Sequence, residues 1–212
     1  RLVPPKKLDL LPGSGVHIIR FNPNLLNNKK SKFIFLFVGR MLADKGLNEL
    51  IAASKQLYKT RQDFTVKLCG FAAAKNNSAI SQSTLDNWAK LPFVNYIGPS
   101  DHIETIYAKA NCVVLPSYRE GMPRSLLEAG AMGLPSITTD VPGCRNIISH
   151  NVNGLLCEVK NANSLCSAMR KLLELSPKAL NELSTNARKK VVDEFDESIV
   201  INKAISVLNS IK

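Results

Sequence analysis

The stretch that decides the fold is Phe33-Ile34-Phe35-Leu36-Phe37-Val38-Gly39-Arg40, residues 33–40. Six consecutive apolar residues, rich in aromatic and β-branched side chains, are typical of a strand buried on both faces of a parallel sheet. Gly39 and Arg40 end this run. From Lys45-Gly46 onward, apolar residues recur at positions 47, 50, 51 and 57, which is a helical period. The sequence therefore predicts a strand, a short turn and a helix.

The same alternation continues along the chain. Strands are predicted at 33–38, 65–69, 94–97, 112–115, 136–139 and 154–157, and helices at 46–58, 81–90, 102–109, 124–131 and 163–175. A further strand is expected near 16–19, and two closing helices at about 177–194 and 197–211. This order favours an α/β domain with a doubly wound, Rossmann-like parallel sheet covered by helices on both faces.

A second informative stretch is Tyr118-Arg119-Glu120-Gly121-Met122-Pro123-Arg124-Ser125-Leu126-Leu127-Glu128-Ala129, residues 118–129. Pro123 fits the first turn of a helix, so we expect a loop before it and a helix to about residue 131. The free amides of that first turn attract phosphate, and Gly121 lets the backbone approach a ligand closely. Glu120 then stays in the loop and Glu128 lies in the helix. We interpret them as separate hydroxyl acceptors, because a hydrolytic pair needs closer carboxyl groups; the alternative is a surface turn and a solvated helix face.

Two cations bracket the turn after the first strand, Arg40 and Lys45. In open parallel sheets the ligand crevice lies beyond the carboxyl ends of the strands, so both cations are placed to meet a diphosphate. The alternative is that Asp44 neutralises one of them. On its own, a strand followed by Gly-Arg is compatible with a structural or a functional turn.

These residues together resemble glycosyltransferase family 4, also called the glycosyl transferases group 1 domain, whose members are retaining nucleotide-sugar transferases of the two-domain GT-B fold. The hallmark of that family is a glutamate, seven residues and a second glutamate, present here as Glu120 and Glu128. Val38-Gly39-Arg40 with Lys45-Gly46, and residues 139–145 (Thr-Asp-Val-Pro-Gly-Cys-Arg), match in the same order. The resemblance covers nearly the whole chain, but only the C-terminal half of such an enzyme.

The resemblance implies a role for each matching residue. Glu128 would accept hydrogen bonds from ribose hydroxyls, Glu120 would be the catalytic residue that contacts the transferred sugar, and Arg40 and Lys45 would hold the diphosphate. The implied substrate-binding residues are Gly39, Arg40, Lys45, Gly121, Met122, Arg124, Ser125 and Glu128. Many relatives have Phe-Gly where this chain has Met122-Pro123, so one backbone donor is lost. We expect a UDP-linked sugar as donor and neither a metal nor a cofactor.

The resemblance also implies the domain organisation. Residues 1–212 would be the donor-binding domain, with 1–15 as an interdomain segment and about 197–211 as a terminal helix that crosses back to the N-terminal domain. The sequence begins at Arg1 rather than methionine, so we expect a piece of a longer protein. The missing N-terminal domain would be its partner, and without it the fragment would be inactive.

Composition narrows the range of partners. The chain has 212 residues, a formal net charge of +11 and apolar runs too short to span a bilayer. The charge favours an anionic partner, namely an anionic membrane surface or a lipid-diphosphate acceptor, and no nucleic-acid motif accompanies it. Five cysteines without ligand spacing indicate free thiols and a cytoplasmic protein, with peripheral association at the inner membrane face as an option.

The expected function is thus sugar transfer to a glycan or lipid-linked acceptor, in bacterial surface polysaccharide or glycan synthesis. Two alternatives stay open at this point. One is a basic module that binds membrane or nucleic acid, motivated by net charge alone. The other keeps the GT-B fold but changes the chemistry to that of an epimerase or phosphorylase.

Overall fold

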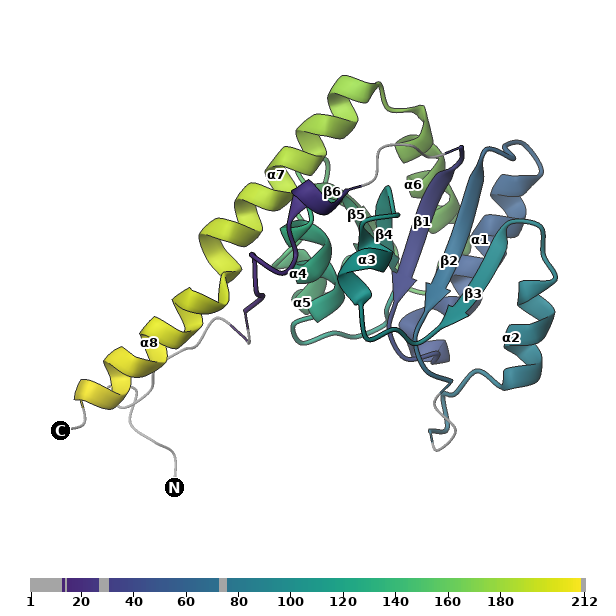
Figure 1. Ribbon diagram of the computed structural model, residues 1–212. Coiled ribbons are helices and arrows are strands. Elements are labelled where there is room, and N and C mark those ends of the chain that lie inside the picture. The colour runs from purple at the N-terminus through teal and green to yellow at the C-terminus, as the bar shows by residue number, and fades with distance from the viewer. Residues whose placement is uncertain (1–12, 14, 27–30, 73–75, 211–212) are drawn as a thin grey trace.

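The computed structural model describes residues 13, 15–26, 31–72 and 76–210, and its centre is one parallel sheet (Figure 1). Its six strands are β1 (Phe33–Val38), β2 (Phe64–Cys69), β3 (Val94–Gly98), β4 (Cys112–Leu115), β5 (Ser136–Thr139) and β6 (Gly154–Cys157). They are ordered β3-β2-β1-β4-β5-β6, and every pairing is parallel. The predicted doubly wound sheet is therefore confirmed, and its six strands lie within a residue of their predicted positions.

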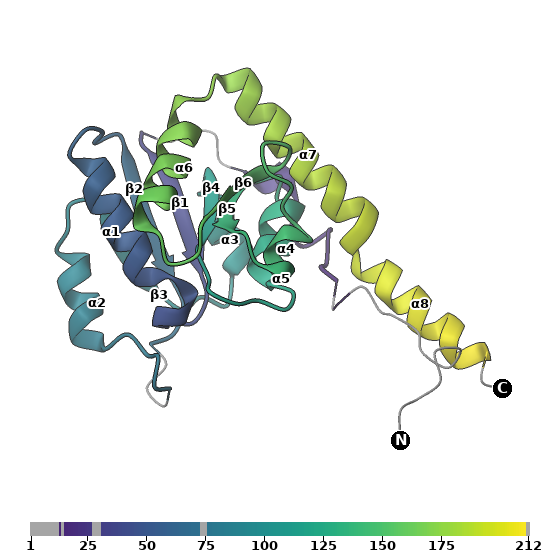
Figure 2. The same cartoon turned by 180° about the vertical axis from the view of Figure 1, so that it is seen from behind.

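Helices cover both faces of this sheet. They are α1 (Leu47–Tyr58), α2 (Gln82–Ala89), α3 (Ile103–Tyr107), α4 (Arg124–Ala131), α5 (Pro142–Arg145), α6 (Ala162–Glu174), α7 (Pro177–Phe195) and α8 (Glu197–Ser210), with short 3-10 turns at Pro23–Leu25 and Ala43–Lys45. Helices α1, α2 and α6 lie on one face and α3, α4 and α7 on the other, with α1 packed on α6 and α4 on α7 (Figures 1 and 2).

The core is densest around β1, as its apolar run predicts. Phe35, Leu36 and Phe37 are fully buried, and Phe35 packs edge-on against Phe64 of β2. All five cysteines are free and buried, which confirms that they pack as small hydrophobic side chains. Burial raises the pKa of the Cys144 thiol to about 11, so this thiol stays protonated and unreactive at neutral pH.

The N-terminal segment differs from its prediction. The strand expected near 16–19 is wrong, because Val16 forms only a single bridge to Asp196 and residues 18–20 turn. The Val16 amide donates to the Phe195 carbonyl at 2.9 Å, which attaches this segment to the junction of α7 and α8 rather than to the sheet. Of the predicted interdomain segment 1–15, all but Gly13 and Gly15 lie outside the described residues.

Helix α8 extends away from the domain (Figure 1). None of its residues 197–209 is buried, and its apolar side chains Ile201, Ile205 and Leu208 are 52%, 49% and 64% exposed. These three residues recur at helical spacing and so form one apolar stripe. In the described part of the chain no helix is long and apolar enough to cross a membrane.

The chain adds β2 and β3 on one side of β1 and then β4, β5 and β6 on the other, so the strand order reverses between β1 and β4. These neighbouring strands lead to α1 on one face and α4 on the other, so a crevice opens between their carboxyl ends, where ligands bind in open α/β sheets. The two loops are held close by Gly46, which has φ +75° and whose absent Cβ would lie 2.0 Å from the Pro116 carbonyl oxygen. Only glycine fits this left-handed, crowded position.

Candidate functional site

A cavity of about 440 Å³ occupies the crevice between β1 and β4. Val38 and Leu115, the last residues of the two strands, form its floor, and the loops that follow them form its walls. Eight of the nine predicted site residues line it: Gly39, Arg40, Lys45, Glu120, Met122, Arg124, Ser125 and Glu128. Its volume lies within the range of small-molecule sites, roughly 300–1,000 Å³. Residues from two distant parts of the sequence thus meet in one pocket.

Gly121 is the predicted site residue that does not line the cavity. It is exposed, its φ is not in the left-handed region, and a Cβ added to it would meet nothing within 4 Å. The glycine that packing requires here is Gly143, because its Cβ would lie 2.3 Å from the Glu120 carbonyl oxygen. This close approach and a hydrogen bond from the Thr139 hydroxyl to the Ser117 carbonyl pack residues 139–145 against the loop that contains Glu120.

Lys45 and Glu120 form an ion pair inside the cavity. The Lys45 Nζ lies 2.6 Å from the Glu120 Oε1, and the two side chains are only 20% and 10% exposed. Glu120, rather than Asp44, is therefore the carboxylate that neutralises a cation of this turn. An ammonium group has three donors, so Lys45 can hold Glu120 and still reach an anionic ligand. Arg40 is exposed at the rim, and within the described residues it has no carboxylate partner.

Glu128 is buried in the wall of the cavity. Its side chain is 12% exposed, and its Oε1 lies 3.8 Å from the Arg124 Nε. Burial raises the pKa of the Glu128 carboxyl, whereas the hydrogen bond from Tyr107 and the charge of Arg124 lower it. A largely desolvated carboxylate accepts hydrogen bonds strongly, which suits it to hold hydroxyl groups of a ligand.

Tyr107 is a site residue that sequence reasoning missed. It is fully buried at the end of α3, and its hydroxyl donates to the Glu128 Oε2 at 2.9 Å and to the Ser125 carbonyl at 3.3 Å. One carboxylate oxygen of Glu128 is therefore fixed by the protein. Nothing in the sequence pairs these residues, because they are 21 positions apart and on different helices.

The start of α4 supplies backbone donors. Helix α4 begins at Arg124, one residue after Pro123, as predicted. The amides of Leu126 and Leu127 donate to the Pro123 carbonyl, so in the described part of the chain the amides of Arg124 and Ser125 are those left for a ligand. Pro123 itself has no amide hydrogen, so the first free amide of this turn is that of Arg124.

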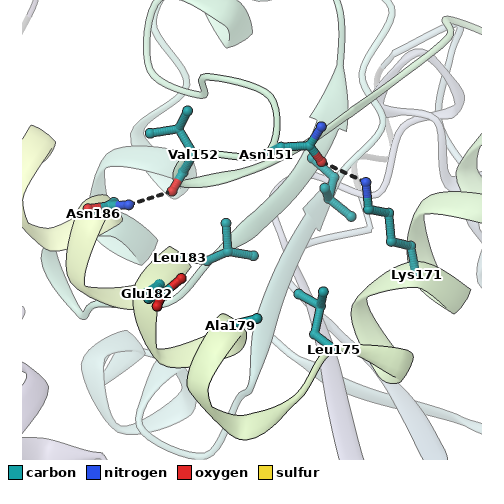
Figure 3. A pocket seen from close by; sticks show the side chains of 9 residues that line it. Asn151, Val152, Lys171, Leu175, Ala179, Glu182, Leu183 and Asn186 are labelled. Atoms are coloured by element: carbon teal, nitrogen blue, oxygen red, sulfur yellow. Dashed lines mark hydrogen bonds between the residues drawn. The ribbon is translucent and has the colours of Figure 1, made fainter.

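A second hollow lies at the opposite edge of the sheet (Figure 3). It is formed by α6, α7 and the loop before β6, where Lys171 donates to Asn151 and Asn186 donates to the Val152 carbonyl. Because it lies at the amino end of β6, it is not at the edge where open parallel sheets bind ligands. None of the predicted site residues line it.

The basic cluster Arg188-Lys189-Lys190 does not form one charged surface. Arg188 is partly buried and donates to the carbonyls of Ile18, Phe21 and Ala131, while Lys189 pairs with Asp193 and Lys190 bonds Ser149. All three side chains are thus engaged by contacts within the domain. The clusters at 6–7 and 29–30 lie outside the described residues.

Comparison with known proteins identifies relatives over the same region. A family model described as Glycosyl transferases group 1 matches residues 19–190. The chain is 29% identical to N,N'-diacetylbacillosaminyl-diphospho-undecaprenol alpha-1,3-N-acetylgalactosaminyltransferase of Campylobacter jejuni, over 97% of this chain and 55% of that protein. It is 28% identical to UDP-Gal:alpha-D-GlcNAc-diphosphoundecaprenol alpha-1,3-galactosyltransferase of Escherichia coli, over 92% of this chain and 52% of that protein.

Solved structures share the fold. A crystal structure of Anabaena HepE in complex with UDP and glucose superposes with a TM-score of 0.81 at 20% identity, over 92% of this chain and 55% of that one. At this identity the likeness concerns the fold alone. The chain spans about half the length of the curated relatives it matches.

Proposed function

The chain belongs to the glycosyl transferases group 1 family, and from this premise we propose that it is the donor-binding half of a retaining glycosyltransferase. The proposed enzyme moves a sugar from a UDP-linked donor to a glycan or lipid-linked acceptor in bacterial surface polysaccharide or glycan synthesis. The observation that carries the proposal is the cavity between β1 and β4. It gathers three cations, the start of a helix and two glutamates around one space.

In this proposal the ribose binds beside Glu128. The carboxylate oxygen that Tyr107 does not hold, Oε1, accepts hydrogen bonds from the ribose hydroxyls. The charge of Arg124, 3.8 Å from that oxygen, helps to keep the buried carboxyl ionised. A pair of hydroxyls bound to an ionised acceptor is a strong and directional contact.

The diphosphate binds between Arg40, Lys45 and the amides of Arg124 and Ser125. As the bond between sugar and phosphate breaks, negative charge grows on the leaving diphosphate. Fixed cations and helix-end amides stabilise this charge without reorganising, so the proposed transfer uses neither a metal nor a cofactor. In this proposal Glu120, whose Oε1 lies 2.6 Å from the Lys45 Nζ, contacts the transferred sugar.

The names of the relatives support the choice of substrates. The Escherichia coli relative is named for a UDP-linked galactose donor and a diphosphoundecaprenol acceptor, and the Campylobacter jejuni relative also for a diphospho-undecaprenol acceptor. The HepE complex contains UDP. We therefore propose UDP as the nucleotide and a lipid-linked acceptor.

Calorimetric titration with UDP, GDP and ADP tests the proposal. We expect UDP to bind, and Glu128→Gln to weaken binding by about tenfold or more, because it removes a charged acceptor. Glu182→Gln is the matched control, since Glu182 is a helical glutamate at the opposite edge of the sheet. Failure of every nucleotide to bind, or an equal effect of both substitutions, would contradict the assignment.

The isolated chain should bind a donor without transferring sugar. The chain spans about half of its relatives, and we propose that the rest of the enzyme supplies most of the acceptor site. Product analysis with a UDP-sugar and a soluble acceptor measures this directly. Sugar transfer by residues 1–212 alone would refute it.

A further inference from the structure

A second basic cavity adjoins the proposed donor pocket. Its volume is about 620 Å³, and it shares Arg40 and Lys45 with that pocket. Its other walls are different, since they come from Asp44, from Tyr118 and Arg119 after β4, and from residues 159–160 after β6. Glu120, Glu128 and the residues at the start of α4 line the donor pocket but not this cavity.

The charge in this cavity is strongly positive. Four cations line it, namely Arg40, Lys45, Arg119 and Lys160, against the single carboxylate of Asp44. Lys45 is engaged by Glu120, whereas Arg119 and Lys160 have no ion-pair partner among the residues that the structure describes. Of two acidic residues in the adjoining loops, Asp140 pairs with Arg145, while Glu158 accepts a hydrogen bond from Asn161 and keeps its charge; neither lines the cavity.

One of these cations, Lys160, lies over an aromatic ring. Lys160 adopts φ 57°, a left-handed conformation that is unfavourable for a side chain of this kind, and its Nζ lies 4.8 Å from the centre of the Tyr118 ring. Tyr118 is fixed in turn, because its hydroxyl donates to Glu49 at 2.7 Å and its amide donates to the Asp44 carbonyl. A strained residue held over an aromatic ring is typical of a binding site.

We propose that this cavity binds a diphosphate group of the acceptor, with Arg119 and Lys160 as its principal contacts. The inference rests on the proposed function, in which the donor diphosphate occupies the neighbouring pocket. Lys45 lines both cavities and pairs with Glu120, so a sugar bound beside Glu120 would adjoin an acceptor whose own diphosphate is held by Arg119 and Lys160. Two relatives are named for acceptors that contain a diphosphate.

The test uses farnesyl diphosphate as a lipid diphosphate and inorganic pyrophosphate as a free one. Each is titrated calorimetrically into the chain, with and without saturating UDP. We expect farnesyl diphosphate to bind in the presence of UDP, and Arg119→Gln with Lys160→Gln to weaken it by about tenfold or more. The same double variant should leave the affinity for UDP within about twofold. Lys55→Gln with Lys178→Gln is the control, because it removes the same charge from two exposed helical lysines.

The outcomes separate this inference from the donor proposal. Displacement of farnesyl diphosphate by UDP, equal weakening in both double variants, or binding of pyrophosphate alone would overturn the acceptor site and leave the donor site standing. If UDP does not bind, while binding of farnesyl diphosphate still depends on Arg119 and Lys160, the donor site is overturned instead. Because Arg119 and Lys160 are exposed, thermal denaturation should show all variants folded.

Discussion

Replacing Tyr107 by phenylalanine should reveal how the buried carboxylate of Glu128 is maintained. The change removes one hydroxyl and keeps the ring, which packs edge-on against Phe21. It leaves the Glu128 Oε2 buried without its donor at 2.9 Å. An unsatisfied buried group of this kind costs roughly 1–3 kcal/mol, so we expect Tyr107→Phe to lower the free energy of unfolding by about that amount at neutral pH.

The loss should depend on pH in a defined direction. Burial raises the folded-state pKa of Glu128 above its usual value, so its ionised form already costs stability as the pH rises through that pKa. The hydrogen bond from Tyr107 lowers this pKa, and without it the pKa rises further. The difference between variant and wild type should therefore be largest at about pH 8, above the raised pKa of Glu128, and smaller at an acidic pH below that pKa.

Urea denaturation at both pH values measures this difference. The matched control is Tyr96→Phe, because the Tyr96 hydroxyl donates to a backbone carbonyl, that of Gly70, at 3.1 Å and no carboxylate is left behind. Its effect should be the same at both pH values. A loss for Tyr107→Phe that does not change with pH would refute the reasoning.

Two further predictions concern the framework of the site. Gly46→Ala should destabilise the chain by about 2–5 kcal/mol in thermal denaturation, because its Cβ would lie 2.0 Å from the Pro116 carbonyl oxygen. The control Gly98→Ala should cost only about 1–2 kcal/mol, because Gly98 has φ +69° but open space around it. Equal losses would contradict the proposed close approach. The double substitution Ile201→Ser with Leu208→Ser on α8 should change the free energy of unfolding by less than about 1 kcal/mol, since both side chains are more than half exposed. A large loss in urea denaturation would show that α8 packs on this domain.

The order of strands and helices could be predicted because each is encoded locally. The apolar run of β1, the helical period after Lys45 and the proline before α4 each act within a few residues, and the structure confirms all three elements. Prediction from local sequence patterns failed at the N-terminal segment and at α5. Val16 forms a bridge to Asp196 instead of a strand, and the four-residue helix α5 is too short to show a period.

The sequence alone determined which residue types could serve an anionic, hydroxyl-rich ligand, since the glutamate spacing, the cations and the helix start are visible in two short stretches. Only the tertiary structure decided how they meet. Parallel pairing of β1 with β4 brings Arg40 and Lys45 beside Glu120 and Glu128, and the buried Tyr107 then fixes one of these carboxylates. Such contacts join residues far apart in the chain, and their energy depends on burial and distance, which no local pattern records.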